Sequence, residues 1–300
     1  MPVESLKSLA LSLGAEVFEN EPMSRHTTFK IGGPVDIFIT PHDEKSMLTL
    51  CSFCSGAKLP LLVIGNGSNL LVADEGLRGV VIKCGSFGDI SVIGEKLSSP
   101  AGASLSAVCE FARESGLSGL EFAYGIPGTV GGAVYMNAGA YGGEMKDAVL
   151  STNHIDGDSV GQFSADELNF GYRKSAYTGT HLAITRAKFA LHSGDKDAIG
   201  EKMRNFLERR RTKQPLEWPS AGSIFKRPPG HFAGTLIEEC GLKGLRVGGA
   251  MVSLKHAGFI VNAGGATCHD VIELVDKIKK EVLRQTGVAL ECEIKIAGEI

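Results

Sequence analysis

The first group of residues that could bind a ligand forms a short loop behind an apolar stretch. Residues 61–64 are Leu-Leu-Val-Ile, and residues 65–71 continue as Gly-Asn-Gly-Ser-Asn-Leu-Leu. Successive backbone N–H groups in such a tight loop can converge on an anion, and a nest of amides suits a pyrophosphate. The Rossmann fingerprint is excluded, because Leu70 stands where its third glycine is required and a brief strand and turn follow in place of a helix. Two interpretations stay open: a phosphate site and a hairpin turn.

A second loop, residues 124–142, is rich in glycine. Seven of the 19 residues from 125 to 143 are glycine, mixed with Thr, Asn and Tyr. A flexible linker would contain more serine and less Ile, Val and Met, so we expect an ordered loop. Either a large flat or extended ligand lies against this backbone, or the glycines allow tight backbone packing.

A basic run, Glu-Arg-Arg-Arg-Thr-Lys at residues 208–213, closes a predicted helix. Cations are favoured at a helix C-terminus, so a solvated helix end explains the run. If the run faces a cleft, the same charges form a diphosphate clamp.

Three single residues have neighbours that suggest chemistry. Arg173 is bracketed by glycine and aromatic residues, which favours a fixed guanidinium over a mobile one. Ser223 follows Ala221 and Gly222, small residues that would let a ligand approach its hydroxyl closely. Glu293 lies in a stretch of alternating polarity whose apolar members face one side, so its carboxylate faces solvent or a site. Their distances along the chain leave open whether the three meet.

Several known motifs are missing or lie in the wrong context. The chain has no Gly-Lys dipeptide, which excludes a Walker A phosphate loop. Residues 157–161 match the nucleophile-elbow pattern G-x-S-x-G, but they join two strand-like runs, which favours a β-hairpin. Cys51 and Cys54 have the spacing of a redox or zinc pair, yet they lie in a helical pattern without a second pair, which favours buried helix cysteines. No metal site is predicted.

Composition limits the class of protein. The chain has 300 residues, a net charge of −3, 43% hydrophobic and 22% charged residues, which is ordinary for a globular protein. This charge predicts no general attraction to nucleic acid or to an anionic membrane, and no apolar run approaches the roughly 18 residues of a membrane span. Seven cysteines, an odd number, do not form a disulfide framework, and the first residues do not resemble a secretory signal. We therefore expect a cytoplasmic protein whose cysteines are mostly reduced and buried.

Hydrophobic periodicity predicts the elements that position these residues. Amphipathic patterns predict helices over residues 3–13, 43–57, 104–116, 195–211, 231–240 and 267–286. Strands are predicted over residues 35–40, 61–64, 79–83, 149–156, 159–164, 183–191, 258–262 and 288–297. Strands and helices do not alternate regularly, so the expected class is α+β rather than a doubly wound sheet or a parallel barrel. The polar break at residues 192–195 predicts a domain junction.

Seven segments, in this order, resemble the UDP-N-acetylenolpyruvoylglucosamine reductase family, the MurB flavoenzymes of bacterial peptidoglycan synthesis. The resemblance runs from about residue 20 to residue 298. The segments are His-Thr-Thr-Phe-Lys-Ile-Gly-Gly at 26–33, Gly-Asn-Gly-Ser-Asn-Leu-Leu at 65–71, Gly-Ile-Pro-Gly-Thr-Val-Gly-Gly at 125–132, Asn-Ala-Gly-Ala-Tyr-Gly at 137–142, Phe-Gly-Tyr-Arg at 170–173, Pro-Ser-Ala-Gly-Ser-Ile-Phe-Lys at 219–226 and Leu-Glu-Cys-Glu at 290–293. One such segment would be a weak signal, whereas seven in family order are specific.

The resemblance implies a FAD-binding domain of the vanillyl-alcohol-oxidase (PCMH) type and a smaller C-terminal α+β substrate domain. We expect the first over residues 1–192, in two lobes divided near residue 85, and the second over residues 193–300, with the last strand returning to the active site. The implied reaction reduces UDP-N-acetylglucosamine enolpyruvate to UDP-N-acetylmuramate, with NADPH as hydride donor and FAD as carrier. The glycine loops contain neither His nor Cys, so FAD is expected to be bound non-covalently.

The family's functional residues fall on this chain motif by motif. The resemblance implies Ser223 as proton donor, and Arg173 and Glu293 as the pair that polarises the substrate carboxylate and stabilises the enolate. A cationic donor and a nearby hydroxyl suit that chemistry. The implied substrate contacts are Tyr141, Tyr172, Lys213 and Arg227. The implied FAD contacts are Gly65, Asn66, Gly67, Ser68, Asn69, Leu70, Gly125, Pro127, Thr129, Gly131, Gly132, Asn137, Ala138 and Gly139.

One departure from the family's pattern indicates which branch of the family the chain resembles. The stretch from Arg173 to the strand at residue 183 is too short for the tyrosine-bearing loop that closes over substrate in one branch, so the chain resembles the shorter type II branch. Arg227, where the other branch carries Asn, is a candidate replacement in the nucleotide clamp. A related flavin oxidoreductase acting on a small alcohol or hydroxy acid, and a non-catalytic nucleotide-sugar binding protein, remain as alternatives. We expect a monomer without nucleic acid or membrane partners.

Overall fold

The computed structural model describes residues 2–299, which divide into two compact units. Unit 1 consists of residues 2–19, 37–66 and 79–209, and unit 2 of residues 20–36, 67–78 and 210–299. Each unit is thus built from separate stretches of chain, whereas the predicted domains, residues 1–192 and 193–300, are divided by a single cut. The assignment of FAD and substrate to those two domains stays a prediction.

A five-stranded antiparallel sheet lies in unit 1. Its strand order is β12 (Ser159–Ser164), β11 (Val149–Asp156), β13 (Ala183–Ala190), β7 (Lys96–Pro100) and β6 (Ser91–Ile93). Asp156 pairs with Ser159 across a two-residue turn in which Gly157 has a φ of 58°, a conformation that favours glycine at the first turn position. The predicted β-hairpin is therefore confirmed, and the nucleophile-elbow match has no structural support.

The other strands before residue 200 form smaller groups. A four-stranded sheet has the order β1 (Glu16–Pro22), β2 (Pro34–Thr40), β5 (Leu77–Lys83) and β3 (Leu61–Ile64). Two-stranded pairs are formed by β8 (Leu117–Ser118) with β14 (His192–Ser193) and by β9 (Gly139–Ala140) with β10 (Gly143–Glu144). The second pair positions the candidate substrate residue Tyr141 in its turn.

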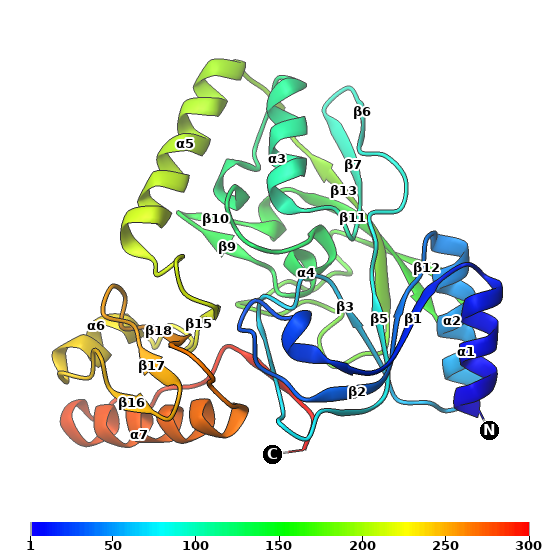
Figure 1. The fold of residues 1–300 in the computed structure, drawn as a ribbon. Helices are drawn as coiled ribbons and strands as arrows, with labels where there is room; N and C mark the ends of the chain where they lie inside the picture. The colour runs from blue at the N-terminus through cyan, green and yellow to red at the C-terminus, as the bar shows by residue number, and fades with distance from the viewer. Residues whose placement is uncertain (1, 300) are drawn as a thin grey trace. The chain divides into compact units, whose positions relative to one another are not determined.

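Polar side chains start the helices that pack on these sheets. Asp43 and Ser104 cap α2 (Glu44–Gly56) and α3 (Leu105–Glu114) by accepting hydrogen bonds from backbone N–H groups of the first turn. α1 (Pro2–Ser12) lies beside α2 (Figure 1). The short α4 (Val130–Tyr135) packs on β13 and β7. The long α5 (Lys196–Lys213) carries the basic run at its end.

Unit 2 contains an antiparallel sheet with an amphipathic helix beside it. The strand order is β15 (Ser220–Ser223), β18 (Phe259–Asn262), β17 (Ala250–Val252) and β16 (Arg246–Val247). α7 (Cys268–Thr286) lies along β16 and β17 (Figure 1), with α6 (Ala233–Glu239) against it. A capping box of Thr267 and Asp270 starts α7, and Gly287, with a φ of 73°, ends it. β4 (Leu70–Val72) and β19 (Lys295–Ala297) pair in parallel.

Each unit has its own apolar core. Phe189, Leu97 and the buried ring of Tyr177 belong to the core of unit 1, and Phe29 and Val271 to that of unit 2. All seven cysteines are free and five are buried, as expected. Within residues 2–299, the structure contains neither a helix that could span a membrane nor a group of three or more His, Cys, Asp or Glu residues arranged for a metal ion.

The six predicted helices are confirmed as α1, α2, α3, α5, α6 and α7. The strand predicted over residues 288–297 is wrong for most of its length, because only Lys295–Ala297 forms a strand. Residues 291 and 293 instead form backbone hydrogen bonds with residues 226 and 224, and Ile296, predicted on the apolar face, is 39% exposed. The expected loop at residues 124–142 also contains a helix, α4, which begins at its N-cap Thr129.

Candidate active site

The two glycine-rich loops meet inside unit 1. Gly65 follows β3, and a Cβ atom on this residue would overlap the hydroxyl oxygen of Thr129, so only glycine permits the approach. Thr129 is buried and caps α4, its Oγ1 accepting a hydrogen bond from the Gly132 N–H at 3.4 Å. The tip of the first loop and the start of α4 therefore form one continuous backbone surface.

Gly131 and Gly132 of the second loop are glycine for different structural reasons. Gly131 donates its N–H to the Ala101 carbonyl at 2.8 Å, and a Cβ on it would lie 2.9 Å from the Ala101 Cβ. Tight backbone packing therefore explains Gly131. Gly132 is exposed, and apart from its chain neighbours and the backbone of its own helix, the described residues bring only Thr129 within 4 Å of an added Cβ. Gly132 thus leaves an open backbone face on which a flat ligand can lie.

Residues 67–71 of the first loop belong to unit 2. The strands that flank it, β3 and β4, pair with β5 and β19 and not with each other, so the hairpin interpretation is wrong. Gly67 has a φ of 59° and lies against the His26 carbonyl, which a Cβ would overlap. The Asn69 carbonyl accepts a hydrogen bond from the Lys295 N–H at 2.9 Å, and its side-chain amide donates to the Glu293 carbonyl at 3.4 Å. The loop is therefore held in place beside residues 293–295.

Asn137, a predicted FAD contact, connects two turns of unit 1. Its side chain is buried, and its amide donates to the Glu144 carboxylate at 2.9 Å and to the Gly171 carbonyl at 3.0 Å. Its Oδ1 accepts from the Lys146 N–H at 2.9 Å. Hydrogen bonds from the Lys146 side chain and then from Asn137, together with the charges of Lys146 and Arg173, lower the pKa of Glu144. The Asn137 side chain therefore acts within the protein, and its backbone N–H donates to the Val134 carbonyl at 3.1 Å; its contact with FAD stays a prediction.

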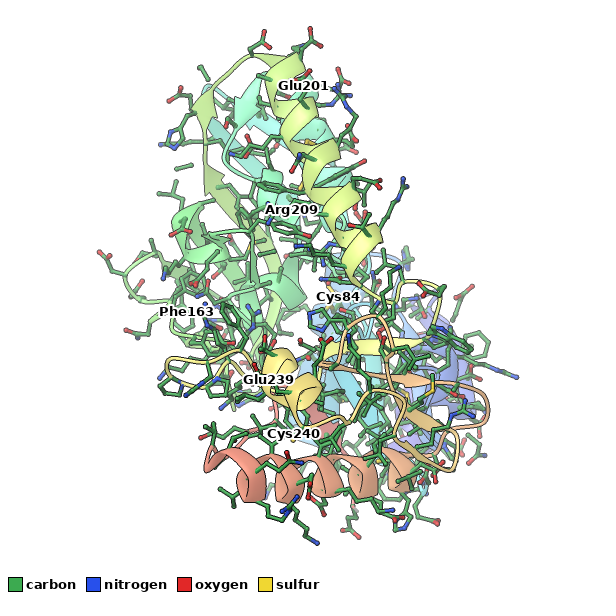
Figure 2. The ribbon with its side chains drawn as sticks, turned by 90° about the vertical axis from the view of Figure 1, so that its left-hand side faces the viewer. Cys84, Phe163, Glu201, Arg209, Glu239 and Cys240 are labelled. Atoms are coloured by element: carbon green, nitrogen blue, oxygen red, sulfur yellow. The ribbon has the colours of Figure 1, made fainter. Side chains whose placement is uncertain are left out.

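Tyr141 has an unusual backbone for its residue type. Tyr141 and Gly142 form the turn between β9 and β10, with φ values of 54° and 91°. Such turns favour Asn or Gly at the first position, so the side chain, not the backbone, explains a tyrosine here. Its ring stacks on Phe206 of α5, with centroids 4.6 Å apart, and the Arg209 guanidinium lies 4.6 Å from the ring centroid. Figure 2 labels Arg209 on α5, after Glu201.

Sequence reasoning missed this stack. In the sequence, Arg209 stands out only as part of the basic run at residues 208–213, for which a solvated helix end is a sufficient explanation. The available signal was the spacing of three residues between Phe206 and Arg209, which places both side chains on one face of a helix. The structure shows that this part of the run is anchored on aromatic rings.

Arg173 also has a positive φ, 55°. It occupies, with Tyr172, a two-residue turn closed by hydrogen bonds between Gly171 and Lys174 at 3.0 and 3.3 Å. The guanidinium carbon lies 5.3 Å from the centroid of the Tyr172 ring. The guanidinium is thus positioned by a tight turn, as the sequence suggests, and it belongs to unit 1.

Ser223 follows a β-bulge in unit 2. The pairing of β15 with β18 shifts by one residue between Ser220 and Ser223, and Gly222 has a φ of 78°. A bulge re-aims the side chain next to it and often lies beside an active site. Ala221 is buried in the core of unit 2, and the expectation that it opens an approach to Ser223 stays a prediction. The positive φ at this bulge explains why residue 222 is a glycine.

Glu293 lies beside the strand that carries Ser223. Its N–H donates to the carbonyl of Ile224, the residue after Ser223, at 2.8 Å. The Glu293 side chain is half-buried. Two of the three predicted catalytic residues are therefore brought together by the fold of unit 2.

The two predicted cationic substrate contacts lie in unit 2 and are exposed. Lys213 is the last residue of α5, and the Lys255 ammonium donates to the Arg211 carbonyl of the same turn at 2.7 Å. Arg227 stacks its guanidinium over the Phe232 ring, 4.0 Å from the centroid. Stacking orders the Arg227 side chain and leaves its charge at the surface.

Unit 1 contains a backbone surface on which a flat dinucleotide cofactor can lie. Gly65 and Gly132 present backbone without a side chain, and Asn66 adds an exposed neutral amide. This set fits FAD. A family model described as "FAD binding domain" matches residues 35–160, and one described as "UDP-N-acetylenolpyruvoylglucosamine reductase, C-terminal domain" matches residues 214–297.

Full-length relatives decide the family. A UDP-N-acetylenolpyruvoylglucosamine reductase of Caldanaerobacter subterraneus subsp. tengcongensis is 47% identical over 298 residues, covering 99% of this chain and 98% of the relative. The chain belongs to the UDP-N-acetylenolpyruvoylglucosamine reductase family. A Clostridium botulinum reductase of the same name is 48% identical, covering 94% of this chain and 93% of the relative. The crystal structure of the Thermus caldophilus reductase matches with a TM-score of 0.80 and 37% identity, covering 95% of this chain and 99% of that one.

Membership confirms three predictions made from the sequence. The fold is α+β, with a FAD-binding domain followed by the C-terminal domain of these reductases. The protein is an oxidoreductase with FAD as cofactor and NADPH as hydride donor. The alternative of a non-catalytic nucleotide-sugar binding protein finds no support.

Proposed function

We propose that this protein reduces UDP-N-acetylglucosamine enolpyruvate to UDP-N-acetylmuramate, in the cytoplasm and as a monomer, for peptidoglycan precursor synthesis. The observation that carries the proposal is 47% identity over 99% of the chain to a reductase named for this substrate. The FAD-binding domain and the two glycine loops that meet at Gly65 and Thr129 support it.

FAD, held against the backbone at Gly65 and Gly132, would supply hydride transfer between NADPH and the enolpyruvyl double bond. The chain must then stabilise negative charge beside the substrate carboxylate and supply a proton. The Arg173 guanidinium, held by its turn, binds the carboxylate and lowers the energy of that charge. Glu293 acts with Arg173 in stabilising the enolate. The Ser223 hydroxyl, aimed by the bulge at Gly222, gives its proton to the substrate carbon and completes the reduction.

The substrate nucleotide requires its own contacts. We assign Lys213 and Arg227 to the diphosphate, since both are exposed cations in unit 2, and Tyr141 and Tyr172 to the sugar and carboxylate end. The stretch after Arg173 agrees with the type II branch: its tyrosine, Tyr177, is buried and its hydroxyl lies 2.6 Å from the Thr152 hydroxyl. Tyr177 therefore does not close over a substrate.

The direct test follows NADPH absorbance with purified, FAD-loaded protein. Oxidation of NADPH beyond one equivalent per flavin is expected only when UDP-N-acetylglucosamine enolpyruvate is added, with a product heavier by two hydrogens. UDP-N-acetylglucosamine without the enolpyruvyl group is the matched control. NADPH oxidation at the same rate with either sugar, or with none, would overturn the proposal.

A further inference from the structure

A histidine that no motif singled out lies beside Ser223. His256 belongs to unit 2, between β17 and β18, and is half-buried. A Cβ placed on Gly258 would lie 3.0 Å from Cε1 of His256 and 3.4 Å from Oγ of Ser223. The imidazole and the hydroxyl therefore face one small space, which exists because residue 258 has no side chain.

The hydrogen bonds of His256 determine which ring nitrogen carries the proton. The Gly258 N–H donates to Nδ1 at 3.1 Å, so Nδ1 is the acceptor and the neutral ring carries its hydrogen on Nε2. The ring packs edge to face on Phe259, with centroids 5.0 Å apart, and the backbone N–H of His256 donates to the Ser253 Oγ at 3.2 Å. The ring is thus fixed in orientation as well as in tautomer.

The surroundings keep this imidazole neutral. Burial lowers the pKa of His256; the charge of Lys243 lowers it further, and its own backbone and Glu238 act in the opposite direction. A Cβ on Gly234 would also lie 3.0 Å from Cε1. Two glycines, Gly234 and Gly258, therefore leave space along the Cε1 edge of the ring.

We propose that His256 is a positioning residue for Ser223, an inference that rests on the proposed function. Its Nε2–H donates a hydrogen bond to the Ser223 oxygen through one water in the space at Gly258. This bond turns the serine O–H toward the substrate and stabilises the oxygen as its proton passes to the substrate carbon. Solvent returns a proton to the oxygen afterwards, and the imidazole stays neutral throughout.

The test is a double-mutant cycle read in separate half-reactions by stopped flow. His256→Leu is expected to slow flavin reoxidation by the enolpyruvyl sugar by about 10- to 100-fold, with flavin reduction by NADPH unchanged. In the Ser223→Ala background the same substitution is expected to have no further effect. His256→Gln, which keeps an N–H donor, should recover most of the rate. His192→Leu, at an exposed histidine, is the matched control.

Two results would overturn the inference and are distinguishable from failure of the proposed function. If Ser223→Ala slows reoxidation and His256→Leu is silent, or costs as much in that background as in the wild type, His256 does not act through Ser223. If Ser223→Ala itself leaves reoxidation at the wild-type rate, the role of Ser223 fails first and the inference fails with it. Gly258→Ala fills the shared space without a left-handed φ and should reproduce the His256→Leu defect if His256→Leu proves too unstable to measure.

Discussion

Replacing Asn137 with alanine removes three buried hydrogen bonds from one side chain. Those bonds reach the Glu144 carboxylate, the Gly171 carbonyl and the Lys146 N–H. At about 1 kcal/mol for each neutral bond and about 1.5 to 3 for the charged one, the loss is about 3 to 5 kcal/mol. Alanine at a φ of 42° adds roughly 1 kcal/mol of backbone strain.

A matched control separates strain from hydrogen bonding. Asn169 has almost the same backbone, with a φ of 43°, but is exposed and donates a single bond, to the Glu167 carbonyl at 3.1 Å. Asn169→Ala should therefore cost roughly the strain alone. Since 1 kcal/mol shifts Tm by about 2–4 °C in a domain of 150–250 residues, Asn137→Ala should melt roughly 6–20 °C below Asn169→Ala. Equal Tm values for the two variants would refute the reasoning.

Three further predictions concern the cofactor, the substrate and pH. Acid precipitation should release the flavin into the supernatant, and colour retained on the denatured protein would contradict non-covalent binding. Lys213→Ala should raise the KM for the UDP sugar while flavin reduction by NADPH changes little; an unaltered KM would leave Lys213 a solvated helix end. Burial lowers the pKa of His154 below its ordinary 6.5, so the unfolded chain binds its proton first and stability is lost as pH falls below about 6.5. Urea unfolding of His154→Gln should depend less steeply on pH over that range, and an unchanged slope would contradict the assignment.

Local signals in the sequence were sufficient for most elements. α7 has an apolar stripe, a capping box at Thr267 and Asp270, and a terminal Gly287, all visible without a structure. The hairpin at Gly157 likewise depends on neighbours in sequence. By contrast, β15 contains Ser220, Ala221, Gly222 and Ser223, which have little β propensity, and only pairing with β18 makes it a strand.

Long-range contacts explain what the sequence could not show about the site. Motifs identified Arg173, Ser223 and Glu293 as candidate site residues. They could not show that the Asn137 side chain donates to the carbonyl of Gly171, in the turn that carries Arg173, because these two residues are far apart in the chain. The discontinuous units have the same origin, since contacts and not chain order define them. Alternation also failed at residues 288–297, because that segment changes partners from residues 224–226 to β4.

Stopped-flow analysis of Ser223→Ala tests the central claim most directly, because it separates flavin reduction from reduction of the sugar. The variant should bind FAD and be reduced by NADPH at the wild-type rate. Reoxidation of its flavin by UDP-N-acetylglucosamine enolpyruvate should slow by about 10² to 10⁴, the usual range for loss of a positioned proton donor. Reoxidation at the wild-type rate would contradict the account, since the proton would then come from another group.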